Sequence, residues 1–130
     1  MTLYEVITEV DNLRPNAIDD EMKARWVMQL EVEYAELMGV PVPELEFPED
    51  QELLMTTPHD YSYVYYLSAL VDNYNQDTAL YNNDYEMANA AVDAAKSWYR
   101  RQHRPTFRGN WVTRVRGYWN RIYSSDPLEP

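Results

Sequence analysis

The sequence predicts an all-α protein: a small helical bundle of four main helices, with a long acidic, proline-rich loop and an extended C-terminal arm. Apolar residues recur every three or four positions in four segments before residue 105, the spacing of helices that bury one face. Prolines and acidic residues concentrate in residues 40–57, between the second and third segments. The 130 residues suffice for one hydrophobic core but not for two. We therefore expect a helical domain, residues 1–105, and a basic aromatic C-terminal arm, residues 106–130.

The first helix is predicted over residues 2–13 by its apolar stripe and by signals at both ends. Thr2 and Glu5 have the spacing of a capping box, in which each side chain bonds the other residue's backbone N–H. Arg14 precedes Pro15, and a residue before proline disfavours the helical conformation, so the helix is expected to end there. The stripe comprises Leu3, Val6, Ile7, Val10 and Leu13.

A second helix is predicted to begin after Asn16 and to stop at Gly39 and Pro41. Acidic residues in its first turns complement the positive end of the helix dipole. The apolar stripe expected to face the core comprises Ile18, Met22, Trp26, Leu30, Tyr34 and Leu37.

Residues 40–57 fit neither a helix nor a central strand, because prolines interrupt the backbone hydrogen bonds among a series of acidic residues. Ordered connections of this length are uncommon and tend to be functional. We expect a surface arm outside the bundle that contacts a neighbouring subunit or the next protein of an assembly. Its candidate contact residues are Pro43, Glu44, Glu46 and Phe47.

The third helix is predicted to begin at Pro58, a residue that suits a first helical turn. Aromatic residues on several sides of one helix cannot all enter one small core, so some are expected at an interface. We select Tyr61 and Tyr65 as candidates for contact with a neighbouring subunit. The main stripe comprises Val64, Leu67, Leu70, Val71 and Tyr74, and the surrounding tyrosines are Tyr61, Tyr63, Tyr65 and Tyr66.

The fourth helix is alanine-rich, which lets a partner helix approach closely, and it is expected to end near His103. Residues 75–77 and residues 82–84 both contain helix-capping types, so either segment could separate it from the third helix. We favour residues 82–84, because that break gives two antiparallel helices of similar length. The stripe comprises Tyr85, Ala88, Val92, Ala95 and Trp98 or Tyr99.

Residues 104–130 combine aromatic side chains with arginines. Their pattern fits a helical face or an alternating strand, so the type of element stays open. Tryptophan, tyrosine and arginine dominate the energetics of protein interfaces, so we expect this segment to dock on an acidic partner surface. The candidate docking residues are Arg104, Arg108, Trp111, Arg114, Arg116, Trp119 and Arg121.

The charge is divided unevenly along the chain. Residues 1–95 carry 20 acidic and 3 basic side chains, about −17 in all, whereas residues 96–130 carry 2 acidic and 8 basic ones, about +6. The acidic residues 1–95 would repel the phosphate backbone of a nucleic acid, which argues against general nucleic-acid binding.

Residues suited to catalysis or metal binding are scarce. The chain has no cysteine, three glycines and two histidines, His59 and His103, while Ser62 and Ser68 fall inside a predicted core helix. These features disfavour a nucleophilic dyad, a thiolate metal site and a glycine-rich phosphate loop. The acidic clusters lack the loop pattern of a cation site and are expected to be solvated charge. We expect no enzymatic activity and no cofactor or metal.

Signals for export or membrane insertion are not found in the sequence. Its first residues lack the basic and apolar regions of a signal peptide. No apolar run approaches the length of about eighteen residues that a membrane helix needs. We expect synthesis in the cytoplasm and no contact with a membrane.

Five short matches, in order along residues 3–105, carry a resemblance to a known family. They are Leu3-Tyr4-Glu5-Val6-Ile7 with Val10-Asp11, Leu13 and Pro15-Asn16; Lys23, Arg25-Trp26 and Leu30; Gln51 to Met55; Pro58, Asp60, Tyr63, Tyr65, Leu67 and Asp72; and Tyr81-Asn82-Asn83 through Ala90, Ala91, Ala94, Trp98, Tyr99, Arg101, His103 and Pro105. Together they resemble the head-tail connector family of tailed phages, also described as head-completion adaptors. The chain departs from the family's pattern at Gln76, where the family has Gly, at Asp84, where it has Ser, and in its longer C-terminal segment.

The resemblance implies a structural protein of the virion neck, assembled in the host cytoplasm. Such adaptors form a homo-oligomeric ring, typically dodecameric, that joins the portal protein to stopper or tail-completion proteins. DNA passes through the ring without sequence-specific binding, and an acidic lumen would let it slide. In this interpretation the docking residues named above meet the portal. The alternative is a phage-encoded acidic inhibitor that mimics DNA and blocks a host DNA-binding enzyme.

Overall fold

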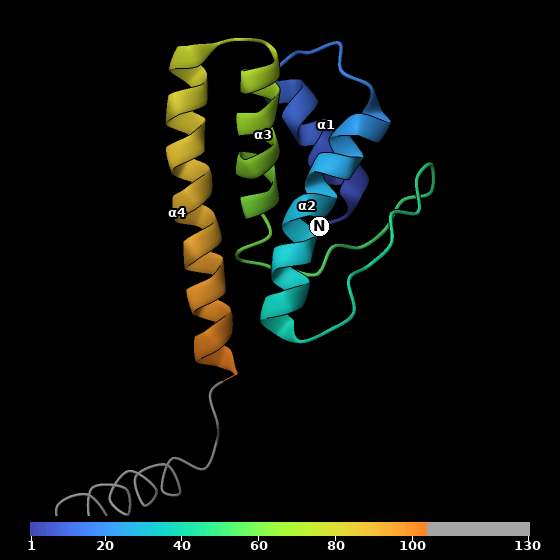
Figure 1. The fold of residues 1–130 in the computed structure, drawn as a ribbon, viewed down its shortest axis with the longest axis vertical. Coiled ribbons are helices and arrows are strands. Elements are labelled where there is room, and N and C mark those ends of the chain that lie inside the picture. Colours follow the sequence, from blue (N-terminus) through green and yellow to red (C-terminus); the bar gives the residue numbers. More distant parts are fainter. Residues whose placement is uncertain (104–130) are drawn as a thin grey trace, which may run out of the picture. The chain divides into compact units, whose positions relative to one another are not determined.

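The computed structural model describes residues 1–103, which contain α1 (Leu3–Leu13), α2 (Asp20–Met38), α3 (Ser62–Tyr74) and α4 (Thr78–Gln102). The predicted all-α class with four main helices is confirmed. Figure 1 shows α1 and α2 on one side of α3, with α4 along the other. Residues Met1–Tyr99 form one compact unit and a second begins at Arg100. The predicted domain boundary at residue 105 lies outside the described residues and stays a prediction.

Helix α1 forms as its sequence signals predict. The Thr2 hydroxyl accepts a hydrogen bond from the Glu5 N–H at 3.2 Å, and the Glu5 carboxylate accepts one from the Thr2 N–H at 3.4 Å, which confirms the capping box. The helix ends at Leu13, with Arg14 as its C-cap before Pro15, as expected. Leu13 is 46% exposed, so its place in the stripe was wrong. The residues that α1 buries are Leu3, Val6, Ile7 and Val10.

Helix α2 stops at Gly39, as predicted, and this glycine adopts the left-handed conformation that closes the last turn (φ 69°). Of its predicted stripe, Ile18, Leu30 and Tyr34 are buried as expected, but Met22 is 43% exposed. The charged residues Lys23 and Glu31 are buried, which the stripe did not include. Both charges have partners; the Lys23 ammonium, for example, lies 2.7 Å from the Asp11 carboxylate. The buried residues of α2 are Lys23, Ala24, Val27, Leu30, Glu31, Tyr34 and Ala35.

Helix α3 begins at Ser62, so the predicted start at Pro58 is wrong; residues 58–61 form turns instead. Leu67 is fully buried as expected, and so is Tyr63, which the sequence placed beside the stripe. Tyr74, assigned to the stripe, is 58% exposed and packs at a tilt against Trp26 instead (ring centroids 6.2 Å apart).

The break between α3 and α4 lies at residues 75–77, so the predicted break at residues 82–84 is wrong. Asp77 supplies the cap, since its carboxylate accepts a hydrogen bond from the Leu80 N–H at 3.1 Å. Asp84 instead lies within α4, buried and paired with Arg14. Helix α4 therefore has 25 residues against the 13 of α3.

Helix α4 meets the rest of the bundle along a narrow face. Ala88 and Ala95 are buried, as predicted, and Val92 and Trp98 pack half-buried against the core. Tyr85 is 50% exposed, which corrects its assignment to the stripe.

The acidic segment of residues 40–57, hereafter the arm, is not wholly outside the bundle. Leu53 and Met55 are buried in the core, and the Leu3 N–H donates to the Gln51 carbonyl at 2.9 Å. The expectation of a separate surface arm is therefore wrong. Its last part lies in the core, and the half-buried Leu45 and Phe47 of its outer part also pack against the core. The physical reason is the short apolar run at residues 53–55, which fills the core beside α1 and α2.

Candidate interaction surface

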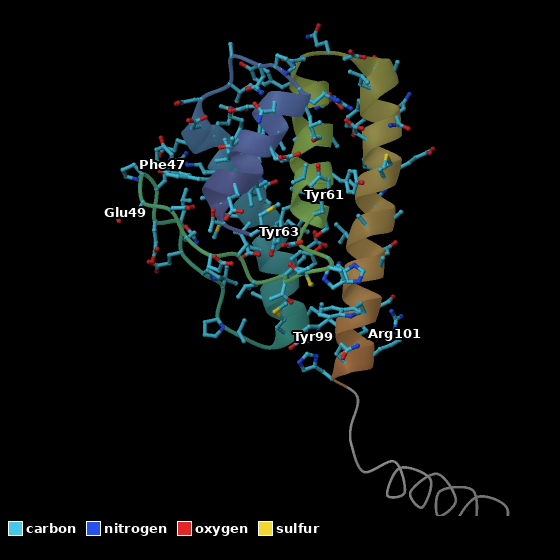
Figure 2. The ribbon with its side chains drawn as sticks, turned by 180° about the vertical axis from the view of Figure 1, so that it is seen from behind. Phe47, Glu49, Tyr61, Tyr63, Tyr99 and Arg101 are labelled. Carbon is cyan, nitrogen blue, oxygen red and sulfur yellow. The ribbon has the colours of Figure 1, made fainter. Side chains whose placement is uncertain are left out.

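The candidate interface residues of the described chain lie on the two flanks of α1. On one flank the Phe47 ring packs edge-on against Tyr4, with ring centroids 6.4 Å apart. On the other the Tyr61 hydroxyl donates a hydrogen bond to the Glu9 carboxylate at 3.1 Å. Figure 2 shows Phe47 and Tyr61 well apart, with α1 between them. We call this region, the outer face of α1 with the arm and Tyr61, the α1–arm surface.

Hydrogen bonds from α1 hold the arm in place. The Tyr4 hydroxyl donates to the Pro48 carbonyl, and the Tyr4 N–H donates to the Asp50 carboxylate at 3.0 Å. Within the arm, the Gln51 side chain accepts from the Glu46 N–H at 2.9 Å and donates to the Glu44 carbonyl at 3.2 Å. The outer part of the arm is thus fastened to α1 and to itself.

The arm presents a row of carboxylates to solvent. Glu44, Glu46, Glu49 and Glu52 are exposed, while Pro43 and Phe47 are half-buried. Glu49 lies at the tip of the arm, pointing away from the helices (Figure 2). Partial burial opposes ionisation of Asp50, but hydrogen bonds from the Tyr4 N–H, the Thr2 hydroxyl and the Gln51 N–H hold its pKa below the ordinary value. The surface is therefore negatively charged at neutral pH.

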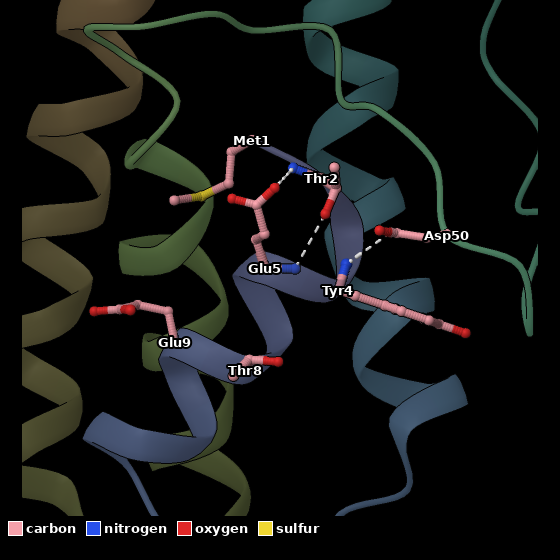
Figure 3. A pocket seen from close by; sticks show the side chains of 7 residues that line it. All are labelled: Met1, Thr2, Tyr4, Glu5, Thr8, Glu9 and Asp50. Carbon is pink, nitrogen blue, oxygen red and sulfur yellow. Dashed lines mark hydrogen bonds between the residues drawn. The ribbon is translucent and has the colours of Figure 1, made fainter.

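A shallow pocket of about 430 Å³ lies on the outer face of α1. Figure 3 shows two of its walls fixed by hydrogen bonds, Glu5 to Thr2 and Asp50 to Tyr4. A second hollow, of about 300 Å³, shares Tyr4 and Thr8 and adds Phe47 with Asp11 and Asp20, two carboxylates that are already paired with Lys23. Carboxylates beside apolar side chains suit a lysine or arginine, whose methylene stem packs while its charge is paired. The first pocket is lined by Met1, Thr2, Tyr4, Glu5, Thr8, Glu9 and Asp50.

Tyr61 and Tyr65 form an aromatic pair at the edge of this surface. Their rings meet edge-on with centroids 5.2 Å apart, and both residues are half-buried. Burial, followed by the nearby Glu9 carboxylate, raises the pKa of Tyr61, so its hydroxyl stays a hydrogen-bond donor. The rings retain exposed area for a partner, and their contact with a neighbouring subunit stays a prediction.

A buried polar network, which our sequence interpretation missed, anchors the end of the arm. The Tyr63 hydroxyl donates to the Glu31 carboxylate and accepts from the Met55 N–H at 2.9 Å, while the Leu54 N–H donates to Glu31 at 3.1 Å. Burial raises the pKa of Glu31 despite these hydrogen bonds, and burial with the adjacent Glu31 charge raises that of Tyr63. The signal in the sequence that could have revealed this network is the presence of polar residues among the apolar stripes of α2 and α3.

His59, Ser62 and Ser68 were considered above as members of a nucleophilic dyad. His59 packs against Trp98, with ring centroids 5.2 Å apart, and Ser62 and Ser68 are buried. Within residues 1–103, no group of three or more histidine, aspartate or glutamate side chains is arranged to hold a metal ion. None of the helices described over that range is long and apolar enough to cross a membrane.

The predicted docking residues of the C-terminal segment lie outside the described residues and stay predictions. They are Arg104, Arg108, Trp111, Arg114, Arg116, Trp119 and Arg121. Comparisons of the chain with protein-family models, with curated proteins and with solved structures gave no match.

Proposed function

We propose that this chain is a head-to-tail connector subunit of a tailed phage, which forms a ring beneath the portal and links it to stopper or tail proteins. The resemblance of five short segments, in order along residues 3–105, to the connector family supports this proposal, and so does the four-helix body. The protein acts by assembly, and its proposed partners are copies of itself, the portal and the next neck protein.

The observation that carries the proposal is the fixed acidic arm. A mobile acidic loop loses conformational entropy when it is ordered on binding, whereas an arm already held against α1 avoids most of that cost. The backbone and side-chain hydrogen bonds of Tyr4 and Gln51 fix Glu44 and Glu46 in a defined row. Such preorganisation is expected of a surface that meets one partner in one geometry.

A closed ring requires two different, complementary surfaces on each subunit, and the α1–arm surface is a candidate for one of them. The α1–arm surface supplies an acidic one with the Tyr61 and Tyr65 rings at its edge. The C-terminal segment supplies arginines and tryptophans, and we assign it to the portal. We assign the α1–arm surface to the neighbouring subunit or to the next neck protein.

The alternative function, a DNA-mimicking inhibitor, is favoured by the exposed carboxylates of the arm. The basic segment after residue 96 is not explained by mimicry, because it would repel the basic DNA-binding cleft that a mimic must enter. A stable complex with a DNA-binding enzyme, in place of a ring, would support the mimic.

The test is electron microscopy of the full-length chain, alone and mixed with the portal protein, for three proteins. These are the wild type, a double variant Glu44→Lys with Glu46→Lys, and a control double variant Glu36→Lys with Glu86→Lys. The control changes the net charge equally at exposed sites on α2 and α4. We expect rings from the wild type and the control, and fewer or none from the arm variant. Equal ring formation by all three proteins would remove the arm from the interface.

A further inference from the structure

Helix α4 is held to the bundle by few buried groups, and one of them is charged. Asp84, Ala88 and Ala95 are the residues that α4 buries over its described length. Near its other end Lys96 pairs with Glu33 at 3.1 Å, and Trp98 packs on His59. The packing of the first half of α4 against the bundle therefore depends on how the charge of the buried Asp84 carboxyl group is compensated.

Asp84 shares a single arginine with a second buried carboxyl group. The Arg14 Nη2 atom lies 2.9 Å from Asp84 Oδ2, and Arg14 Nε lies 3.2 Å from Asp72 Oδ1. Asp72 is 1% exposed and Asp84 4% exposed. The Asp72 Oδ2 atom has no hydrogen-bond partner within residues 1–103. Two ionised carboxylates here would leave one negative charge uncompensated and one buried oxygen unsatisfied.

The other charged groups near Asp72 and Asp84 do not compensate this excess negative charge. Asp77, in the turn between α3 and α4, adds a further negative charge near Asp72. From α2, Lys23 is paired with Asp11 and Asp20, and the buried Glu31 is bonded to Tyr63. Burial first, then the Asp84 carboxyl, raises the pKa of Asp72 to about 7, although Arg14 opposes the shift.

We propose that Asp72 and Asp84 share one proton while α4 is docked, and that loss of this proton loosens the first half of α4 from α3. The proton lets one carboxyl group donate a hydrogen bond to the other, and the remaining charge is paired with Arg14. A site of this kind makes the docking of α4 depend on pH within the range that cells and purification buffers span.

The direction of the pH dependence follows from proton binding. The docked state holds the proton up to a pKa of about 7, whereas an exposed aspartate releases it near pH 4. The stabilisation is therefore complete below about pH 4 and is lost as the pH rises toward 7. If one proton binds with a pKa of about 7 in the docked state and about 4 in the open state, local opening of the first half of α4 should increase roughly 30-fold from about pH 5.5 to pH 8.

Hydrogen exchange measured by mass spectrometry on the full-length protein tests this proposal, with rates corrected for intrinsic pH dependence. In the wild type we expect the protection of residues 78–88 to fall roughly 30-fold from about pH 5.5 to pH 8, relative to α1. In Asp72→Asn it should stay constant, because the amide donates to Asp84 at every pH. Asp84→Asn should flatten the profile as well, since Asp72 then has Arg14 to itself.

Glu86→Gln is the control, because it removes an exposed charge from the same helix and should keep the wild-type profile. A flat wild-type profile would overturn the proposal. An equal fall in the wild type and both aspartate variants would also overturn it, by assigning the effect to the general charge of the body.

Discussion

Tyr63→Phe removes one hydroxyl from the network that anchors the arm and leaves the ring in place against Tyr34 (ring centroids 5.4 Å apart). The hydroxyl accepts from the buried Met55 N–H at 2.9 Å and donates to the buried Glu31 carboxylate. Without it the N–H has lost its acceptor, and Glu31 keeps the Leu54 N–H at 3.1 Å. A buried group left unsatisfied costs about 1–3 kcal/mol, and a lost hydrogen bond to a charged group about 1.5–3 kcal/mol. We therefore expect a loss of roughly 2.5–6 kcal/mol in the free energy of unfolding.

The loss should also depend on pH. Burial raises the pKa of Glu31, and the Tyr63 hydrogen bond lowers it, so the variant should raise this pKa further. Because the pKa of Glu31 is higher in the folded than in the unfolded protein, the free energy of unfolding falls as the pH rises above the ordinary glutamate pKa. The fall is larger in the variant, because its folded-state pKa is higher still. The deficit of Tyr63→Phe should therefore be greater at pH 8 than at pH 5.

Urea denaturation followed by circular dichroism at both pH values measures the effect. The control is Tyr66→Phe, whose hydroxyl donates to Gln29 at 3.2 Å in an exposed position and should cost less than about 0.5 kcal/mol. A deficit for Tyr63→Phe as small as that of the control would refute the role of the network.

Leu67→Ala should cost about 2–5 kcal/mol by urea denaturation because the side chain is fully buried, whereas Trp98→Ala should cost less because the ring is half-buried; equal small losses would contradict the packing of α3 and α4. Deleting residues 43–49 should leave helicity by circular dichroism nearly intact, since the buried Leu53 and Met55 remain and only the half-buried Leu45 and Phe47 are lost from the edge of the core, while head-tail joining falls; loss of helicity would make this part of the arm structural. Truncation after Pro105 should change the melting temperature by a few degrees at most and abolish joining to portal-containing heads, and truncated protein that completes infectious particles would rule out the docking role.

The parts of the fold that could be predicted from sequence are those set by neighbouring residues. The capping box of Thr2 and Glu5, the end of α1 before Pro15 and the glycine stop of α2 each depend on contacts within a few positions. Apolar spacing likewise identified α1 and most of the core of α3. Local chemistry decided these features, so a single sequence was enough.

Features that depend on distant partners were missed. Asp84 was taken for a helix break because aspartate is a capping residue, but Arg14, seventy positions away, stabilises it inside α4. The burial of Lys23 and Glu31 on α2 was missed as well, because Asp11 and the Leu54 N–H, with which they pair, lie on other segments. Burial of such charges requires knowing the partner, and spacing along one helix does not provide it.

For the candidate surface, too, local features could be predicted from the sequence and contacts between distant residues could not. Proline and glutamate content identified the arm as a solvent-facing segment, and Glu44 and Glu46 are exposed, whereas Phe47 is half-buried and packs against the core. Its attachment to α1 through Tyr4 could not be predicted, because that contact spans more than forty residues. The pocket beside Glu5 and Glu9 follows from this attachment, so it was missed as well.

The measurement that tests the proposed function most directly is electron microscopy of portal particles before and after the full-length chain is added. If the chain is a connector subunit, a ring of added density with the rotational symmetry of an oligomer will cover the tail-facing side of the portal. Portal particles that look identical with and without the chain, over a range of salt concentrations, would contradict the proposal.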